Sequence, residues 1–242
     1  MPPKRKSQTI DGAAKRSRVD KKKTSATTQR SKSSTNASTK ARASQSDLVI
    51  EWFKRHCDPD DPEIISPEGC QAFFEEIQVP LDSIYPILIA WKMNANRMGY
   101  FAKEEWIHGM KDMNVDTPEK LRNILPTLER SLQDEQTFKK LYQFAFGYGK
   151  SPGQKSMDVD VAIAMWQVLL NNSRYPDILS FIEFLQTEKP VKVINKDQWS
   201  SLLDFFCSLP PDLSTYDHTS SWPVLFDDYV SWKTEKQTNM ES

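Results

Sequence analysis

The chain has 242 residues and a formal net charge of −1, but its charges are divided very unevenly. Residues 1–45 contain 13 Lys or Arg and two acids, which leaves 19 basic and 31 acidic residues for positions 46–242. The longest apolar run, Ile84 to Trp91, is far too short for a membrane span, and the start of the chain lacks a secretory leader. We therefore expect an intracellular protein without a membrane partner.

The first 45 residues form a basic tail of Ser, Thr, Lys and Arg without any aromatic residue. Such a segment cannot bury enough apolar surface to offset its chain entropy, so we predict disorder. Its basic clusters are typical of a two-part nuclear import signal, in which the charged residues are Lys4, Arg5, Lys6, Lys15, Arg16, Arg18, Lys21, Lys22 and Lys23. Phosphate binding is the competing interpretation, but no aromatic side chains are interleaved for base stacking. Import is favoured, and simple solubilisation is a third alternative.

From residue 46 onward the chain is rich in Trp, Phe, Leu and Ile and is divided by Pro, Asp and Gly clusters. Apolar residues recur at helical spacing, and no convincing pair of strands appears. The sequence predicts an all-α body with helices near 46–56, 67–77, 82–95, 102–112, 117–133, 135–149, 158–171, 176–187, 195–208 and 222–236. Pro86 fits the third helix only if that helix begins near Asp82 or Ser83, because proline is tolerated in a first turn.

Residues 94–105 are close to the template of a calcium-binding loop, with Gly99 at the sixth place and Glu105 at the twelfth. The first, third and fifth places hold two asparagines and Met98, and calcium requires more carboxylate oxygens than this. An upstream loop at 58–69 has acids at its start but lacks the central glycine and the closing glutamate. We predict paired helix-loop-helix units that are EF-hand-like and hold no metal.

Two helix starts are visible near the C-terminus. Asn195 and Gln198 have the spacing of an N-cap pair, so Asp197 lies in the first turn of the helix that follows. Pro223 opens the second helix, in which Asp227 and Asp228 lie opposite an apolar stripe. Acids at such positions usually complement the helix dipole or contact only water.

These segments together resemble the potentiating-neddylation (PONY or DCUN1) domain of the defective-in-cullin-neddylation (DCN-like) proteins. The matching motifs occur in the same order along the chain: Ile89 to Lys92, Gly99 to Phe101, Glu105 to Met110, Thr117 to Arg122, Phe144 to Phe146, Trp166 to Leu170, and Ile194 to Val230. The resemblance implies a domain over 46–236 with a C-terminal helical lobe, followed by a short tail at 237–242. The basic tail at the front is similar to that of the nuclear subgroup of the family.

The resemblance also implies an acidic patch that binds the C-terminal winged-helix domain of cullins. Two acids and a small residue between them form this patch in the family, and the matching positions are Asp197, Ser221 and Asp227. The small residue is alanine in the family, so Ser221 is a departure that adds a hydroxyl group while keeping the volume small.

A second implied site is an apolar pocket for the acetylated N-terminal methionine of the neddylation conjugating enzyme. Its matched positions are Cys70, Pro86, Ile89, Ala90, Phe101, Tyr148, Met165 and Val168. Acetylation removes an ammonium charge whose desolvation would cost several kcal/mol, while burial of the methionine contributes roughly 1.5–3 kcal/mol. Without the resemblance, residues of these types are usually helix-packing core.

A catalytic function finds little support in the sequence. None of the three histidines stands at motif spacing from a nucleophile, and there is no phosphate-binding glycine loop. We expect a scaffold, not an enzyme, that needs no cofactor and works beside the RING subunit of a cullin ligase. We expect it in the nucleus, with the cytoplasm left open as a further compartment, and we do not expect nucleic acid as a partner. The alternatives are a nuclear nucleic-acid or chromatin adaptor and, more remotely, a calcium sensor.

Overall fold

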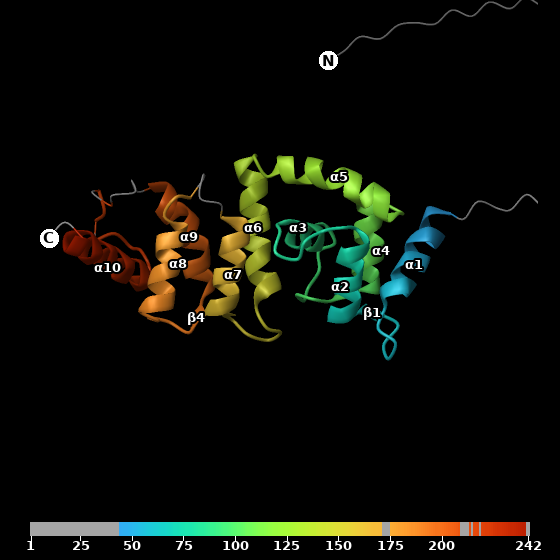
Figure 1. Ribbon diagram of the computed structural model, residues 1–242, viewed down its shortest axis with the longest axis horizontal. Helices are drawn as coiled ribbons and strands as arrows, with labels where there is room; N and C mark the ends of the chain where they lie inside the picture. The colour runs from blue at the N-terminus through green and yellow to red at the C-terminus, as the bar shows by residue number, and fades with distance from the viewer. Residues whose placement is uncertain (1–43, 171–174, 209–212, 214, 218, 241–242) are drawn as a thin grey trace, which may run out of the picture. The chain divides into compact units, whose positions relative to one another are not determined.

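The computed structural model describes residues 44–170, 175–208, 213, 215–217 and 219–240. The basic tail with its import-like clusters lies outside these residues, as do the last two residues of the chain. The described part is built of helices (Figure 1), so the all-α prediction is confirmed. The helices are α1 (Gln45–His56), α2 (Pro67–Glu76), α3 (Tyr85–Lys92), α4 (Lys103–Asp112), α5 (Pro118–Ser131), α6 (Glu135–Gly149), α7 (Val159–Leu169), α8 (Ile178–Thr187), α9 (Lys196–Ser208) and α10 (Val224–Met240).

Two short antiparallel ladders join the helices in pairs. Strands β1 (Ile64–Ile65) and β2 (Phe101–Ala102) connect the loop between α1 and α2 with the loop between α3 and α4. Strands β3 (Met157–Asp158) and β4 (Val193–Ile194) connect the loops of the α6–α7 and α8–α9 units in the same way. The expectation that no strand pair occurs was therefore wrong. Each strand has two residues, which is too short to show the alternation of apolar and polar residues by which strands are recognised.

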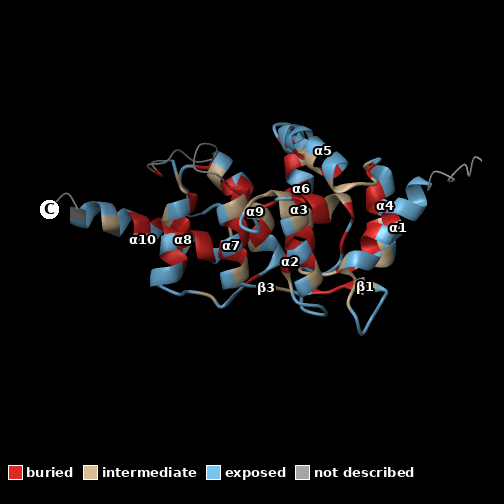
Figure 2. Cartoon of the chain, turned by 45° about the vertical axis from the view of Figure 1, so that its right-hand side comes forward, coloured by how far each residue is buried: buried red, intermediate tan, exposed pale blue. Residues whose placement is uncertain are grey.

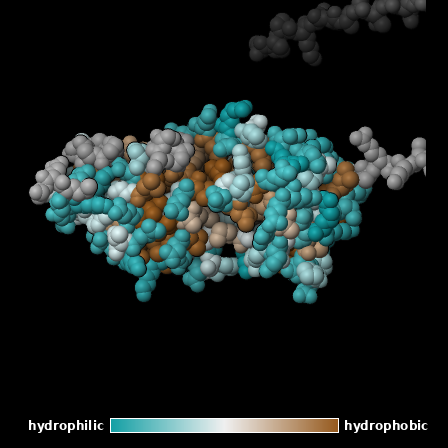
Figure 3. All heavy atoms as spheres, in the orientation of Figure 1, coloured by the Kyte–Doolittle hydropathy of each residue, from teal (hydrophilic) through white to brown (hydrophobic). Residues whose placement is uncertain are grey.

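Helix α6 is the element on which both helix-loop-helix pairs meet. It packs against α3 on one side and against α7 and α9 on the other, while α8 packs against α7 and α10. Buried residues line the inward faces of these helices (Figure 2). In the space-filling view, hydrophobic residues also reach the surface over α6, α7 and α8 between hydrophilic ones (Figure 3).

Several helix boundaries differ from expectation by a few residues. Helix α1 begins at Gln45, and its cap is Ser44, whose hydroxyl accepts from the N–H of Asp47. Helix α3 begins at Tyr85 and not near 82, but it keeps Pro86 within its first turn as predicted. Helix α10 begins after Pro223 and continues to Met240, four residues beyond the expected end.

The closing glutamate of the calcium-loop template is occupied by the protein itself. Glu105 Oε1 accepts from the backbone N–H of Asn96 at 3.0 Å and from its side-chain amide at 2.6 Å. Glu105 Oε2 accepts from the N–H of Ala102 at 2.9 Å. These donors use the oxygens that would face a calcium ion in a metal-binding loop. Within the described ranges, no group of three or more His, Cys, Asp or Glu is arranged to hold a metal.

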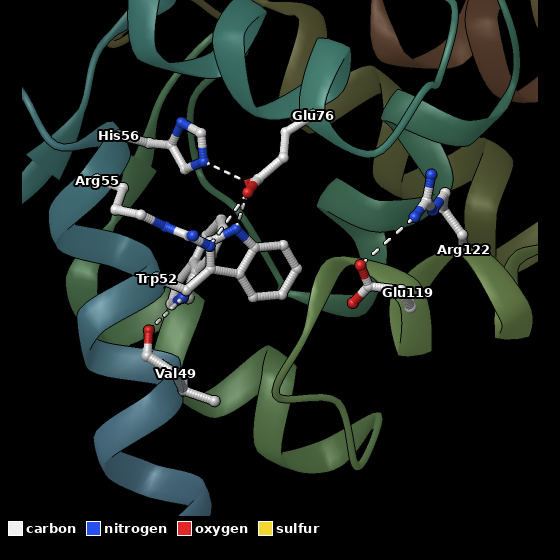
Figure 4. A network of polar contacts seen from close by, with 8 residues as sticks. Val49, Trp52, Arg55, His56, Glu76, Glu119 and Arg122 are labelled. Carbon is white, nitrogen blue, oxygen red and sulfur yellow. Dashed lines mark hydrogen bonds and ion pairs between the residues drawn. The ribbon is translucent and has the colours of Figure 1, made fainter. Parts of the chain in front are cut away.

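Glu76 joins α1 to α2 through three side chains that point toward its carboxylate (Figure 4). Trp52 Nε1 donates to it at 2.6 Å, His56 Nε2 lies 2.8 Å away, and Arg55 forms an ion pair at 3.1 Å. Burial acts to raise the pKa of Glu76, but the hydrogen bonds from His56 and Trp52 and the charge of Arg55 outweigh it and hold the pKa below its ordinary value. The ionised carboxylate therefore stabilises the fold.

Replacing Glu76 by glutamine is expected to lower the free energy of unfolding at pH 7 by about 1–3 kcal/mol, because a charged acceptor is lost. A depressed pKa gives stability that is present above the ordinary pKa and is lost as pH falls through the folded-state value, so the deficit should shrink below about pH 4. Urea unfolding at several pH values measures this. Glu51→Gln, at an exposed acid on α1, is the matched control and should change little.

No helix in the described part of the chain is both long enough and apolar enough to span a membrane.

Candidate functional site

A cavity of about 570 Å³ opens between the first helix-loop-helix pair and helices α6 and α7. Six of the eight residues expected in an apolar pocket line it: Cys70 from α2, Pro86 from α3, Phe101 from β2, Tyr148 from α6, and Met165 and Val168 from α7. Residues from five elements far apart in the sequence thus form one apolar wall. A concave wall of apolar side chains is typical of pockets that bind an apolar group.

The other two expected residues, Ile89 and Ala90, do not line the cavity. Both are fully buried in the core. They lie in the middle of α3, one turn beyond Pro86, so they support the helix whose first turn reaches the cavity wall.

Sequence reasoning missed several lining residues. Val161 and Ala164 precede Met165 and Val168 on α7 and share their face at the helical spacing i, i+3, i+4 and i+7, a signal that could have found them. Leu81 and Met98 also line the cavity, although their side chains are 58% and 45% exposed. They come from loops, where no periodicity identifies them. Large apolar side chains exposed at a cavity are a surface on which a partner could gain buried area.

The two buried titratable side chains of the cavity, Cys70 and Tyr148, are neutral. Burial raises the pKa of Cys70 to about 12. Burial also raises the pKa of Tyr148 to about 12, and a hydrogen bond from the backbone of Gly99 only partly opposes this. Asp160, which is exposed, is the one acid among the lining residues. The buried part of the cavity wall therefore suits an uncharged apolar group, because the only carboxylate among the lining residues is that of the exposed Asp160.

The expected acidic patch begins at the start of α9. The predicted cap is confirmed, since Gln198 N–H donates to Asn195 Oδ1 and Asn195 N–H donates to Gln198 Oε1, both at 2.9 Å. Asp197 lies in this first turn and is exposed. Trp199, two residues later, is fully buried and is stacked on Tyr142 with ring centroids 4.6 Å apart. This anchoring fixes the turn that carries Asp197.

The other two patch positions lie at the start of α10. Ser221 is exposed just before the helix, and Asp227 is half-buried in its first turn. Tyr216 donates its hydroxyl hydrogen to Asp227 Oδ1. Burial, together with this hydrogen bond, raises the pKa of Tyr216 above its ordinary value, so the hydroxyl stays protonated and continues to donate. Sequence reasoning did not identify Tyr216 as a partner of Asp227.

Ring contacts attach the start of α10 to α9. Phe205 of α9 lies 5.7 Å from Trp222 and 4.7 Å from Phe226, measured between ring centroids. These contacts hold Ser221 and Asp227 beside the second half of α9. Asp197 is eight residues before Phe205, which is about 12 Å along the helix axis. The three positions thus lie on two helices that are packed together, with Asp197 two turns away from the other pair.

Comparison with known proteins gives consistent results. Residues 120–232 match the family model described as "Cullin binding". The chain is 38% identical to DCN1-like protein 4 of Homo sapiens over 240 residues, which cover 98% of this chain and 79% of the relative. It is also 38% identical to human DCN1-like protein 5 over 190 residues, or 78% of each chain. DCN1-like protein 4 of Drosophila melanogaster is 36% identical over 191 residues, which cover 79% of this chain and 76% of the relative. The chain therefore belongs to the DCN1-like protein family, as its sequence motifs predicted.

Proposed function

We propose that this protein is a non-catalytic cofactor of cullin neddylation that holds a cullin and the neddylation conjugating enzyme together. The observation that carries the proposal is the cullin-binding match over 120–232, because this range contains Asp197, Ser221 and Asp227. Family membership supports the same role.

On the cullin side, the proposed contact is the acidic patch of Asp197, Ser221 and Asp227 against a basic surface of the winged-helix domain. Tyr216 donates a hydrogen bond to Asp227 Oδ1 and thereby orients the carboxylate that we propose faces the cullin. Ser221 is exposed, so its hydroxyl can be solvated in the free protein and adds a polar group to the centre of the contact.

On the enzyme side, the proposed ligand of the cavity is the acetylated N-terminal methionine of the conjugating enzyme. In this proposal, the wall formed by Cys70, Phe101 and Met165 buries the thioether side chain. Acetylation removes a charge that would otherwise be desolvated against this uncharged wall. Ile89 and Ala90 act from behind this wall, as packing for α3.

The proposed action is to raise the effective concentration of the two partners and to orient the thioester toward the acceptor lysine. In this proposal, the conjugating enzyme and the RING subunit of the cullin ligase catalyse formation of the bond between the modifier and the acceptor lysine. No residue of this chain is assigned a catalytic role, and no cofactor is invoked. We place this activity in the nucleus on the basis of the basic clusters in the tail.

Replacing Tyr216 by phenylalanine is expected to weaken binding of the cullin winged-helix domain by about 1 kcal/mol, roughly fivefold, because Asp227 loses a hydrogen-bond donor. The ring contact with Phe205, at 6.0 Å, can be kept by phenylalanine, so the melting temperature should change little. Calorimetric titration of both proteins measures the effect. Unchanged affinity would show that Tyr216 does not orient Asp227 for binding.

Removing residues 1–42 separates this proposal from a chromatin or nucleic-acid adaptor that uses the basic tail. The deletion keeps Ser44, which caps α1. Stimulation of modifier transfer to a cullin in a reconstituted reaction should survive, because both proposed sites remain. Loss of all activity in that reaction, with binding of nucleic acid by the full chain, would favour the adaptor.

A further inference from the structure

A separate open groove of about 480 Å³ lies along α6, where the chain leaves this helix and where α9 begins. It shares no lining residue with the apolar cavity, and its Lys196 is the chain neighbour of Asp197 in the acidic patch. Its lining includes Gln143, Phe146 and Gly147 of α6, together with Lys150, Lys155 and Lys196.

The groove is positively charged in a body that is acidic elsewhere. Three of its lining residues are lysines and none is an acid, whereas residues 46–242 carry 31 acids and 19 Lys or Arg. Lys155 and Lys196 lie at the same end of the β3–β4 ladder, two residues before Met157 and two after its partner Ile194. The ladder thus brings the two charges together from segments 41 residues apart.

These lysines are not neutralised within the part of the chain that the structure describes. Neither Lys150, Lys155 nor Lys196 forms an ion pair there. Lys150 Nζ donates to the carbonyl oxygen of Gln154 at 2.8 Å, which holds the loop and leaves two ammonium hydrogens for another acceptor. Like charges held at one groove repel each other, and an anionic partner would relieve this repulsion.

Gly147 is an exposed glycine on the part of α6 that lines this groove. It lies within α6, where glycine costs about 0.5–1 kcal/mol relative to alanine. Apart from its chain neighbours and the nearby backbone of α6 itself, a Cβ atom built at this position would meet no atom of the described residues within 4 Å, so packing against other elements does not require the glycine. By contrast, a Cβ atom at Gly149 would meet Met165 at 2.7 Å. A close approach by a partner to the backbone of α6 would account for Gly147.

We propose that this groove binds an acidic segment of a partner protein, rich in Asp or Glu. Charge complementarity selects the partner, because three lysines face an open groove without an internal counter-charge. Nucleic acid fits less well, since the one aromatic lining residue, Phe146, is only 5% exposed and cannot serve as a stacking platform. The groove also shares α6 with the cavity, through Tyr148, and adjoins Asp197 through Lys196. An acidic segment bound here would lie close to elements of both proposed sites.

The test is fluorescence anisotropy of a labelled hexaglutamate peptide titrated with the full chain at low salt. Replacing Lys150, Lys155 and Lys196 together by glutamine should weaken binding about tenfold, since three cationic contacts are lost. The matched control replaces Lys21, Lys22 and Lys23 of the tail by glutamine, which removes the same charge and should have about a twofold effect or less. Gly147→Ala should weaken peptide binding while the melting temperature stays the same or rises, which a purely structural role of Gly147 cannot produce.

Absence of peptide binding by the wild-type chain would overturn the proposal. An equal loss of peptide affinity in the groove variant and in the tail variant would also overturn the proposal, because peptide binding would then depend on net charge alone. Peptide binding by Gly147→Ala that equals the wild type would refute the close approach to α6. Tighter binding of a labelled single-stranded oligonucleotide that depends on the three groove lysines would assign the groove to nucleic acid instead.

Discussion

Reversing the charge of Asp197 and Asp227 together, by lysine substitution, is expected to abolish detectable binding of a cullin C-terminal winged-helix domain. Asp197 is exposed in the first turn of α9, so its reversal should leave the fold intact. Asp227 is half-buried and accepts a hydrogen bond from Tyr216, so its reversal removes an oriented carboxylate and introduces a cation facing the partner's basic surface. Loss of one member of a charge pair at an interface typically costs about 2–5 kcal/mol, and reversal at two positions exceeds this.

A matched control distinguishes the effect of the two patch residues from the effect of a changed net charge. Glu51 and Glu104 are exposed acids on α1 and α4, and changing both to lysine alters the net charge by the same amount. This control should retain binding with a modest change in association rate. Calorimetry at two salt concentrations measures both variants, and equal binding by the patch variant and the wild type would refute the assignment of Asp197 and Asp227.

Filling the apolar cavity is the second change for which we expect a large effect. Ala164 lines the cavity on α7 and is itself exposed, so Ala164→Phe places a ring in the open space without displacing the core. In this variant, the first methionine of an N-acetylated peptide can no longer be buried in the cavity, which should cost about 1.5–3 kcal/mol of binding free energy. The affinity for the peptide should therefore fall by roughly 10- to 150-fold. Gln167→Phe is the control, because Gln167 is exposed on the same helix and does not line the cavity.

The same titration tests the role of acetylation. A peptide of identical sequence with a free amino group should bind the wild-type chain much more weakly, because its ammonium would be desolvated beside the neutral Cys70 and Tyr148. Equal affinity for the two peptides would contradict the proposed ligand. Equal loss in Ala164→Phe and Gln167→Phe would show that the peptide binds elsewhere on α7.

Local features of the fold were predictable from the sequence. The cap formed by Asn195 and Gln198 depends on residues three apart, and the tolerance of Pro86 depends on its place in a first turn; both are confirmed. The ladder that pairs Ile64 with Ala102 joins two segments that are distant in the sequence. Each segment has only two residues, so no local sequence pattern predicts the pairing. It is nevertheless the feature that holds the two loops of the first helix-loop-helix pair together.

In the candidate sites, too, residues at helical spacing could be predicted from the sequence, whereas residues in loops and contacts between distant segments could not. Met165 and Val168 were named from motif positions, and their helical spacing leads directly to Val161 and Ala164 on the same wall. Leu81 and Met98 come from loops, and Ile89 and Ala90 proved to be core, because periodicity does not reveal which side of a short apolar helix faces a cavity. The hydrogen bond from Tyr216 to Asp227 depends on how the segment before α10 folds back, which only the three-dimensional structure provides.

We propose that this chain accelerates modifier transfer by holding two partners at two separate sites. The most direct test is the single-turnover rate of modifier transfer to a cullin, measured with and without this protein. The donor in this reaction is the N-acetylated conjugating enzyme that carries the modifier as a thioester, and the RING subunit is present. We predict acceleration by the wild type, which is lost in Asp197→Lys with Asp227→Lys and, separately, in Ala164→Phe, but kept in Gln167→Phe. No acceleration by the wild type, or full acceleration by both variants, would contradict the account.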